Sequence, residues 1–257
     1  LTADIARERG LAIDMPGYER AMDAQRERAR AASNFSSADT STAVPLDALK
    51  LIGEEQNFCG YEDLSIDTEV SGLFCDGKAV ATLAQGDSGS IVLSKTPFYA
   101  ESGGQVGDTG LLLSPGGRFV VQDTQKRAGL FVHSGVVQQG SITKQDTIKA
   151  QVSNSTRQKT RLNHSATHLL HAALRNVLGT HVAQKGSLVD AEKLRFDFSH
   201  DTALSQDEIA QVEQAVNEQI RCNHEVKVAE MWFKEAQDDG AVALFGEKYG
   251  DEVRVLD

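Results

Sequence analysis

The sequence has few cysteines, few prolines and no long apolar run. Its three cysteines, Cys59, Cys75 and Cys222, are spread over 257 residues. Because they are widely spaced and odd in number, no disulfide framework is expected, which suits a reducing cytoplasm. No apolar run approaches the roughly 18 residues that a membrane span requires, and no signal peptide is recognisable. We therefore expect a cytoplasmic chain that makes no membrane contact.

An excess of basic charge is also missing. The chain has 26 Lys and Arg against 37 Asp and Glu, which gives a formal net charge of −11. Domains that bind nucleic acid indiscriminately are usually basic, so this balance argues against such binding but not against local contacts. Arg157, Lys159 and Arg161 form one basic cluster. It is at least as well explained by a solvated helix face as by a nucleic-acid contact.

The composition that remains is that of an ordinary globular protein. Apolar residues make up 40% of the chain and charged residues 25%. The length is sufficient for two or three small units with their own cores. Residues 1–43 predict a helical arm, in which Asp14 caps a helix that carries Pro16 in its first turn. The small polar residues 33–42 that follow are interpreted as a linker.

Residues 44–152 change to short runs rich in β-branched and aromatic residues, separated by turn signals. Asp76-Gly77 is a strong hairpin signal, and Gly103, Gly104, Gly107 and Gly110 form a glycine-rich loop. This spacing predicts a small antiparallel β-barrel or sandwich. The expected strands are 66–74, 78–83, 91–93, 111–113, 119–121, 131–137 and 147–152.

Residues 153–257 mix helices and strands without a regular βαβ repeat. Ser205 and Glu208 form a capping box at the start of a helix that ends at Asn223, and strands are expected at 184–188, 194–198, 225–231 and 249–255. The whole chain is therefore predicted to be α+β, with a helical arm, a barrel and a third unit that begins at residue 153.

The longest predicted helix, residues 160–178, carries the clearest functional signal. Its apolar stripe is expected to include Leu162, Ala173 and Val177, with the histidines on roughly the opposite side. His164 and His168 are one turn apart, so both rings can share one metal ion. Such a pair is by itself a weak signal, and a solvated helix face is the commoner explanation of it.

Two long motifs in this chain resemble those of the alanyl-tRNA synthetase family. Residues 163–171 (NHSATHLLH) and 179–187 (GTHVAQKGS) resemble its editing domain, and residues 96–110 (TPFYAESGGQVGDTG) resemble its Gly-Gly-Gln signature. Residues 14–32 also resemble the linker between the aminoacylation and editing halves of these enzymes. The chain begins with Leu1 and not Met, so we expect an internal fragment that covers linker, barrel and editing domain.

The resemblance implies hydrolysis of serine or glycine wrongly attached to tRNA for alanine, with the acceptor end of that tRNA as partner. His164 and His168 would be two of four zinc ligands. The other two, in a Cys-x-x-x-His motif, would follow Asp257, so weak zinc binding and deficient editing are expected. Cys222-Asn223-His224 has the wrong spacing to replace them, and Cys222 is expected to be a buried apolar residue. ATP and Mg²⁺ would belong to the absent upstream half.

Further site residues follow from the resemblance with less support from the sequence itself. Thr167 and Gln184 are the expected substrate-selecting pair, although each could equally be a plain surface residue. In the glycine-rich loop, Gly103, Gly104 and Gln105 are expected near the substrate, with Gln105 able to hydrogen-bond it; a wide turn is the plainer alternative. Two other functions remain open, a freestanding editing hydrolase and a noncatalytic tRNA-binding module. Oligomeric state is not predicted.

Overall fold

The computed structural model describes residues 14–32, 44–50, 52, 56–241 and 250–256. The chain divides into two compact units, Leu1–Ala43 and Val44–Asp257. In the first unit, helix α2 (Met15–Ala32) begins where the sequence predicts, because the Gly17 amide donates to Asp14 Oδ1 at 2.9 Å. The expected linker at residues 33–42 lies outside the described residues.

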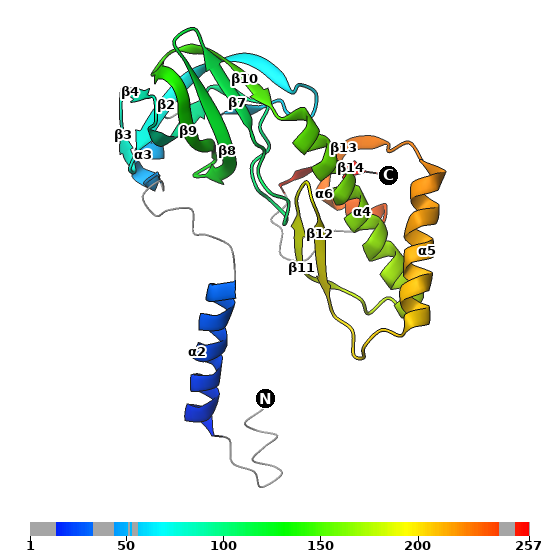
Figure 1. The fold of residues 1–257 in the computed structure, drawn as a ribbon. Helices are drawn as coiled ribbons and strands as arrows, with labels where there is room; N and C mark the ends of the chain where they lie inside the picture. Colours follow the sequence, from blue (N-terminus) through cyan, green and yellow to red (C-terminus); the bar gives the residue numbers. More distant parts are fainter. Residues whose placement is uncertain (1–13, 33–43, 51, 53–55, 242–249, 257) are drawn as a thin grey trace. The chain divides into compact units, whose positions relative to one another are not determined.

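The second unit begins with a closed antiparallel barrel. Its six strands follow the order β10-β7-β8-β9-β5-β2, and β10 also pairs with β2, which closes the barrel (Figure 1). Closure removes the unpaired edges that an open sheet would expose. The predicted antiparallel barrel is therefore confirmed. The strands are β2 (Ser65–Cys75), β5 (Ser88–Leu93), β7 (Gly110–Ser114), β8 (Gly117–Arg127), β9 (Leu130–Thr143) and β10 (Thr147–Val152).

The predicted hairpin after β2 is present, but the strand after it is shorter than expected. Asp76 and Gly77 both have positive φ, 49° and 71°, as a two-residue hairpin turn of this kind requires. In place of one strand over 78–83, β3 (Lys78–Ala79) pairs with β2 and β4 (Thr82–Ala84) pairs with β9. Between β3 and β4 the chain stops pairing with β2 and begins to pair with β9. The residue pattern of one strand does not indicate such a change of partner strand.

The barrel interior is apolar, with a smaller cluster at its rim. Leu73, Ile91, Phe98, Leu112 and Phe119 are among its fully buried side chains. A second cluster places α3 (Leu46–Lys50) against the barrel, and β1 (Asn57–Phe58) pairs in parallel with β6 (Lys95–Thr96).

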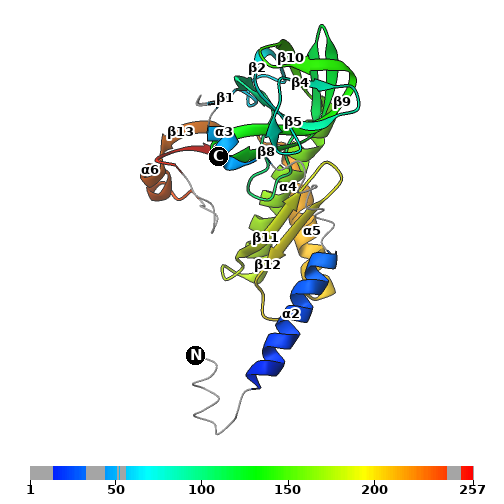
Figure 2. The same cartoon turned by 90° about the vertical axis from the view of Figure 1, so that its left-hand side faces the viewer.

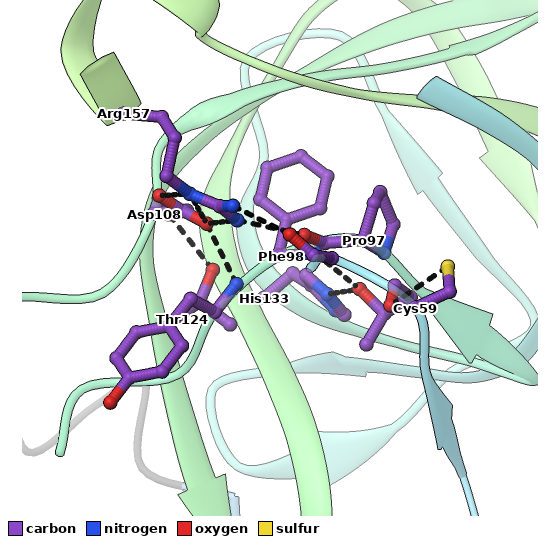
Figure 3. A network of polar contacts seen from close by, with 10 residues as sticks. Cys59, Pro97, Phe98, Asp108, Thr124, His133 and Arg157 are labelled. Carbon is purple, nitrogen blue, oxygen red and sulfur yellow. Dashed lines mark hydrogen bonds and ion pairs between the residues drawn. The ribbon is translucent and has the colours of Figure 1, made fainter. Parts of the chain in front are cut away.

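One histidine lies inside the barrel. His133 is fully buried; its Nδ1 donates to the Ile91 carbonyl at 2.9 Å, and its Nε2 lies 2.8 Å from Thr96 Oγ1. Phe98 packs edge-on against the ring (Figure 3). Burial lowers the pKa of His133 to about 4, so the ring is neutral at physiological pH.

The remainder of the second unit is built around one long helix. Helix α4 (Asn154–Leu178) packs against a hairpin of β11 (Gln184–Val189) and β12 (Leu194–Phe198), and against α5 (Gln206–Cys222). In both views the hairpin lies along α4 (Figures 1 and 2). These elements share an apolar core that includes Ala173, Leu174, Val182 and Val212.

The ends of α5 match the sequence prediction. The Glu208 amide donates to Ser205 Oγ at 3.3 Å, the Ser205 amide donates to Glu208 at 2.7 Å, and Asn223 ends the helix in the left-handed conformation. Cys222 does not match: it is exposed, not buried as expected, because the last turn of α5 extends past the core.

A small antiparallel pair follows α5. It joins β13 (Val228–Trp232) to β14 (Glu252–Leu256), with α6 (Phe233–Asp238) following β13. Arg254 of this pair stacks over Tyr61 beside the barrel, with 4.1 Å from the guanidinium carbon to the ring centroid. The α+β class is confirmed. Among the described helices, none has the length and apolarity needed to cross a bilayer.

Candidate functional site

The buried face of α4 differs from the predicted apolar stripe. Leu162 is 61% exposed, so its assignment to the core was wrong. The first half of the helix packs against polar loop residues of the barrel and contacts the turn of the hairpin, where Asn163 Nδ2 donates to the Asp190 carbonyl at 2.8 Å. Its second half joins the apolar core that α5 and the hairpin share. The buried side chains of α4 are Arg157, Thr160, Thr167, Ala173 and Leu174.

A small cavity lies beside the middle of α4. Three parts of the chain contribute to it: α4, the β11–β12 hairpin and the glycine-rich loop of the barrel. Five of the sequence-predicted site residues meet there, although they are spread over 82 positions from Gly103 to Gln184 inclusive. Its lining consists of Gly103, His164, Thr167, His168, His171, Gln184, Ser187, Val189 and Phe196.

The two predicted metal ligands lie one above the other. The rings of His164 and His168 are stacked, with centroids 5.0 Å apart and planes 10° from parallel. Burial, and next the neighbouring His168, lower the pKa of His164 below its ordinary value. His164 is therefore neutral near pH 7, the form in which an imidazole ligates a metal.

Gln105 contacts His164, and it does not line the cavity. Its side chain is 6% exposed, and its Oε1 accepts a hydrogen bond from His164 Nδ1 at 2.5 Å. A direct hydrogen bond from Gln105 to the substrate, as expected from the sequence, would therefore compete with its hydrogen bond to His164.

The glycine-rich loop lies directly on β11. The Val106 amide donates to the Val189 carbonyl at 3.0 Å, and the Val189 amide donates to the Gly104 carbonyl at 2.8 Å. Gly104 has φ of +85°, and a Cβ there would be 2.6 Å from the Ser187 carbonyl oxygen. Only glycine fits this approach, so the loop is a wall of the site and not a plain turn.

A buried ion pair fastens the same loop to the start of α4. Arg157 Nε donates to both carboxylate oxygens of Asp108, at 2.9 and 3.0 Å, and the guanidinium also reaches the carbonyls of Gly60 and Pro97 (Figure 3). Asp108 in turn accepts from the Tyr99 amide at 2.7 Å. The two side chains are 9% and 5% exposed. The interpretation of Arg157 as part of a solvated face was therefore wrong.

The Thr167 hydroxyl lines the cavity with its proton already donated to a backbone carbonyl. Thr167 is 7% exposed, and its Oγ1 donates to the Asn163 carbonyl one turn earlier at 2.8 Å. Because the proton is engaged, the oxygen can only accept from a molecule in the cavity.

Four lining residues were not predicted as site residues: His171, Ser187, Val189 and Phe196. Ser187 and Val189 alternate with outward residues of β11, and Phe196 lies opposite Ser187 on β12, so the strand period could have identified them. His171 packs on Phe196 at 5.1 Å, and its buried Nε2 makes no hydrogen bond. Burial and next Arg175 lower the pKa of His171.

The donors fit half of a zinc site. His164 and His168 supply two imidazoles at the spacing of one helical turn, and Gln105 occupies the second nitrogen of one ring. No cluster of three or more His, Cys, Asp or Glu suited to a metal ion occurs in the described part of the chain.

Comparison with known proteins gives consistent results. The sequence profile of the tRNA synthetases class II (A) matches residues 1–156. Alanine–tRNA ligases from Shewanella loihica and Methylococcus capsulatus are each 53% identical to this chain, and that of Nitrosomonas europaea is 52% identical. All three alignments cover 100% of the chain but only 28 to 29% of the relatives' length. Because the profile matches more than half of its residues, the chain belongs to the family of class II tRNA synthetases (A).

Proposed function

We propose that this chain is part of an alanine–tRNA ligase and that the cavity beside α4 edits mischarged tRNA. The reaction is hydrolysis of the ester that joins serine or glycine to the 3′ end of tRNA for alanine. The observation that carries the proposal is the convergence of His164, His168, Thr167, Gln184 and Gly103 on one cavity. ATP-dependent attachment of alanine, with its Mg²⁺, is assigned to other parts of the cytoplasmic ligase.

The proposed chemistry needs two groups of residues, one that binds zinc and one that selects the substrate. When bound by His164 and His168, zinc would lower the pKa of water to about 7 or hold the substrate. The described residues supply two donors, so we expect the chain by itself to bind zinc weakly and to edit poorly.

The proposed selection uses hydrogen bonding. Thr167 Oγ1 can accept from the serine hydroxyl or the substrate ammonium, since its own proton is donated to Asn163. Gln184 lines the same cavity from the first residue of β11 and can donate or accept. For serine against alanine, a site that hydrogen-bonds the serine hydroxyl discriminates far better than one that tests size alone, because alanine would leave the polar groups of the site unpaired.

The proposal also concerns domain organisation. We assign residues 1–43 to a linker arm, 44–152 to the barrel and 153–257 to the editing domain. The barrel contributes a wall of the site, since Gly103 lines the cavity and Gln105 contacts His164. Barrel and editing domain are therefore expected to work only together.

The direct test is deacylation of serine-charged alanine tRNA with added zinc. The assay compares this chain with one extended through the expected Cys-x-x-x-His motif. Activity in the longer chain that is abolished by His168→Asn supports the proposal, and matching activity in the shorter chain would show that the residues present suffice. If the extended chain binds zinc and the tRNA but leaves the ester intact, the editing function is wrong and a tRNA-binding module is favoured.

A further inference from the structure

We propose that Gln105 positions His164 for metal binding by fixing which ring nitrogen carries the proton. This proposal rests on the proposed metal site but assigns a role to a barrel residue that contacts neither metal nor cavity. The contact joins Gln105 Oε1 to His164 Nδ1 at 2.5 Å, between residues 59 positions apart in the sequence.

The chemistry of the contact sets its direction. A carboxamide oxygen can only accept a hydrogen bond, so His164 Nδ1 must donate. In the neutral ring, Nε2 then keeps its lone pair and is the nitrogen available to a divalent ion. A hydrogen bond from the second ring nitrogen is the arrangement that orients metal-ligating histidines and raises their basicity.

Gln105 is held for this role by its own surroundings. Its side chain is 6% exposed. Its backbone pairs with Ser102, with 2.9 Å from the Gln105 amide to the Ser102 carbonyl. On its other side, the loop is attached to β11 through Gly104, Val106 and Val189. The glutamine is thus fixed by the barrel loop and the hairpin before any ligand arrives.

The ion pair of Asp108 and Arg157 completes this placement. Asp108 follows Gln105 by three residues on the same loop, and Arg157 precedes His164 by seven residues on α4, about two helical turns. The pair therefore holds the loop and the helix in one register, which keeps the carboxamide opposite His164 without contributing to the site itself.

The test uses three variants of the 257-residue chain, labelled with ¹⁵N-histidine and free of metal. Gln105→Leu removes the acceptor, and Gln105→Glu keeps one. Gln139→Leu is the matched control, because Gln139 is exposed on the far strand β9. Two-bond ¹H–¹⁵N spectra report the tautomer of each ring, with the His164 signals identified by their loss in His164→Asn. Zn²⁺ affinity is measured on the same samples against a chromophoric chelator.

We expect His164 to be protonated at Nδ1 in the parent chain, the Glu variant and the control. In Gln105→Leu it changes to the Nε2-protonated form, and the Zn²⁺ dissociation constant rises about 10- to 100-fold. An unchanged tautomer in Gln105→Leu would overturn the proposal, and so would a changed tautomer with Zn²⁺ affinity within about twofold of the parent. If the Leu variant does not fold, Gln105→Met carries the same test.

This outcome is separate from that of the editing proposal. Neither measurement requires tRNA, so absence of deacylase activity would count against the editing function alone. An unchanged His164 tautomer in Gln105→Leu would count against the role of Gln105 alone.

Discussion

The two halves of α4 are buried in different ways. Its first half is fixed by polar groups, with Arg157 inserted among Asp108 and two backbone carbonyls of the barrel. Its second half is fixed by apolar packing, with Ala173 and Leu174 against Val182 and Val212. The histidines lie between the two. The first half is therefore positioned by directional hydrogen bonds and an ion pair, whereas the second half is stabilised by buried apolar surface. The candidate site lies where the two halves meet.

Breaking the polar half is expected to have the largest effect on stability. Arg157→Met leaves the carboxylate of Asp108 buried without its partner, which typically costs about 3–5 kcal/mol. Chemical denaturation measures the loss. The double variant Arg157→Met/Asp108→Asn removes the uncompensated charge and should recover part of it. A loss below about 1 kcal/mol in Arg157→Met would contradict the assignment of the ion pair as the fixing contact.

Truncation in the apolar half is expected to cost somewhat less. Leu174 is 3% exposed, so Leu174→Ala should destabilise by about 2–4 kcal/mol through lost transfer energy and a cavity. Leu162→Ala is the matched control on the same helix, since that side chain is 61% exposed. We expect a change within about 0.5 kcal/mol for the control. Equal losses in the two variants would contradict the observed burial.

Acid should test the buried neutral histidine of the barrel. The pKa of His133 is lowered to about 4 in the folded chain, against 6.5 for the ordinary side chain. Between these values the unfolded chain binds more protons, so stability is complete above about pH 6.5 and falls as the pH drops towards 4. The contribution is at most about 3 kcal/mol. Denaturation midpoints of the parent and His133→Gln over this range measure it; equal slopes in both would contradict it.

The smallest expected effect is at the start of α5. Ser205→Ala removes the side chain that accepts from the Glu208 amide and should cost about 1 kcal/mol. Ser205→Asp, which keeps an acceptor, should cost little. Thermal unfolding of both variants checks the result, and equal losses would mean that the capping box does not stabilise this helix.

Much of the fold follows from local sequence signals. Alternation, the Asp76-Gly77 turn and the Ser205 cap predict the strands and helix ends, since each depends on neighbouring residues. The partner change between β3 and β4 could not be predicted, because it depends on β9, about 60 residues away. The exposure of Leu162 and Cys222 was also missed, since a periodic pattern does not indicate where a neighbouring element ends.

The candidate site was only partly accessible from sequence. His164, His168, Thr167 and Gln184 were identified with the help of family resemblance, and the cavity brings them together. The contact of Gln105 with His164 was not predicted, because it joins the barrel loop to α4 over 59 positions of the sequence. The burial of Arg157 was not predicted either. Its charge suggested a surface position, and only the fold places Asp108 opposite it.

The assignment of the cavity beside α4 as an editing site can be tested in an intact alanine–tRNA ligase that contains this segment. Thr167→Val removes the hydroxyl at nearly constant shape, and Thr167→Ser restores it. We expect Thr167→Val and Gln184→Ala to accumulate serine on tRNA for alanine while alanine activation is unchanged, and Thr167→Ser to stay near the parent. A parallel fall in alanine activation, or no serine accumulation in either variant, would contradict it.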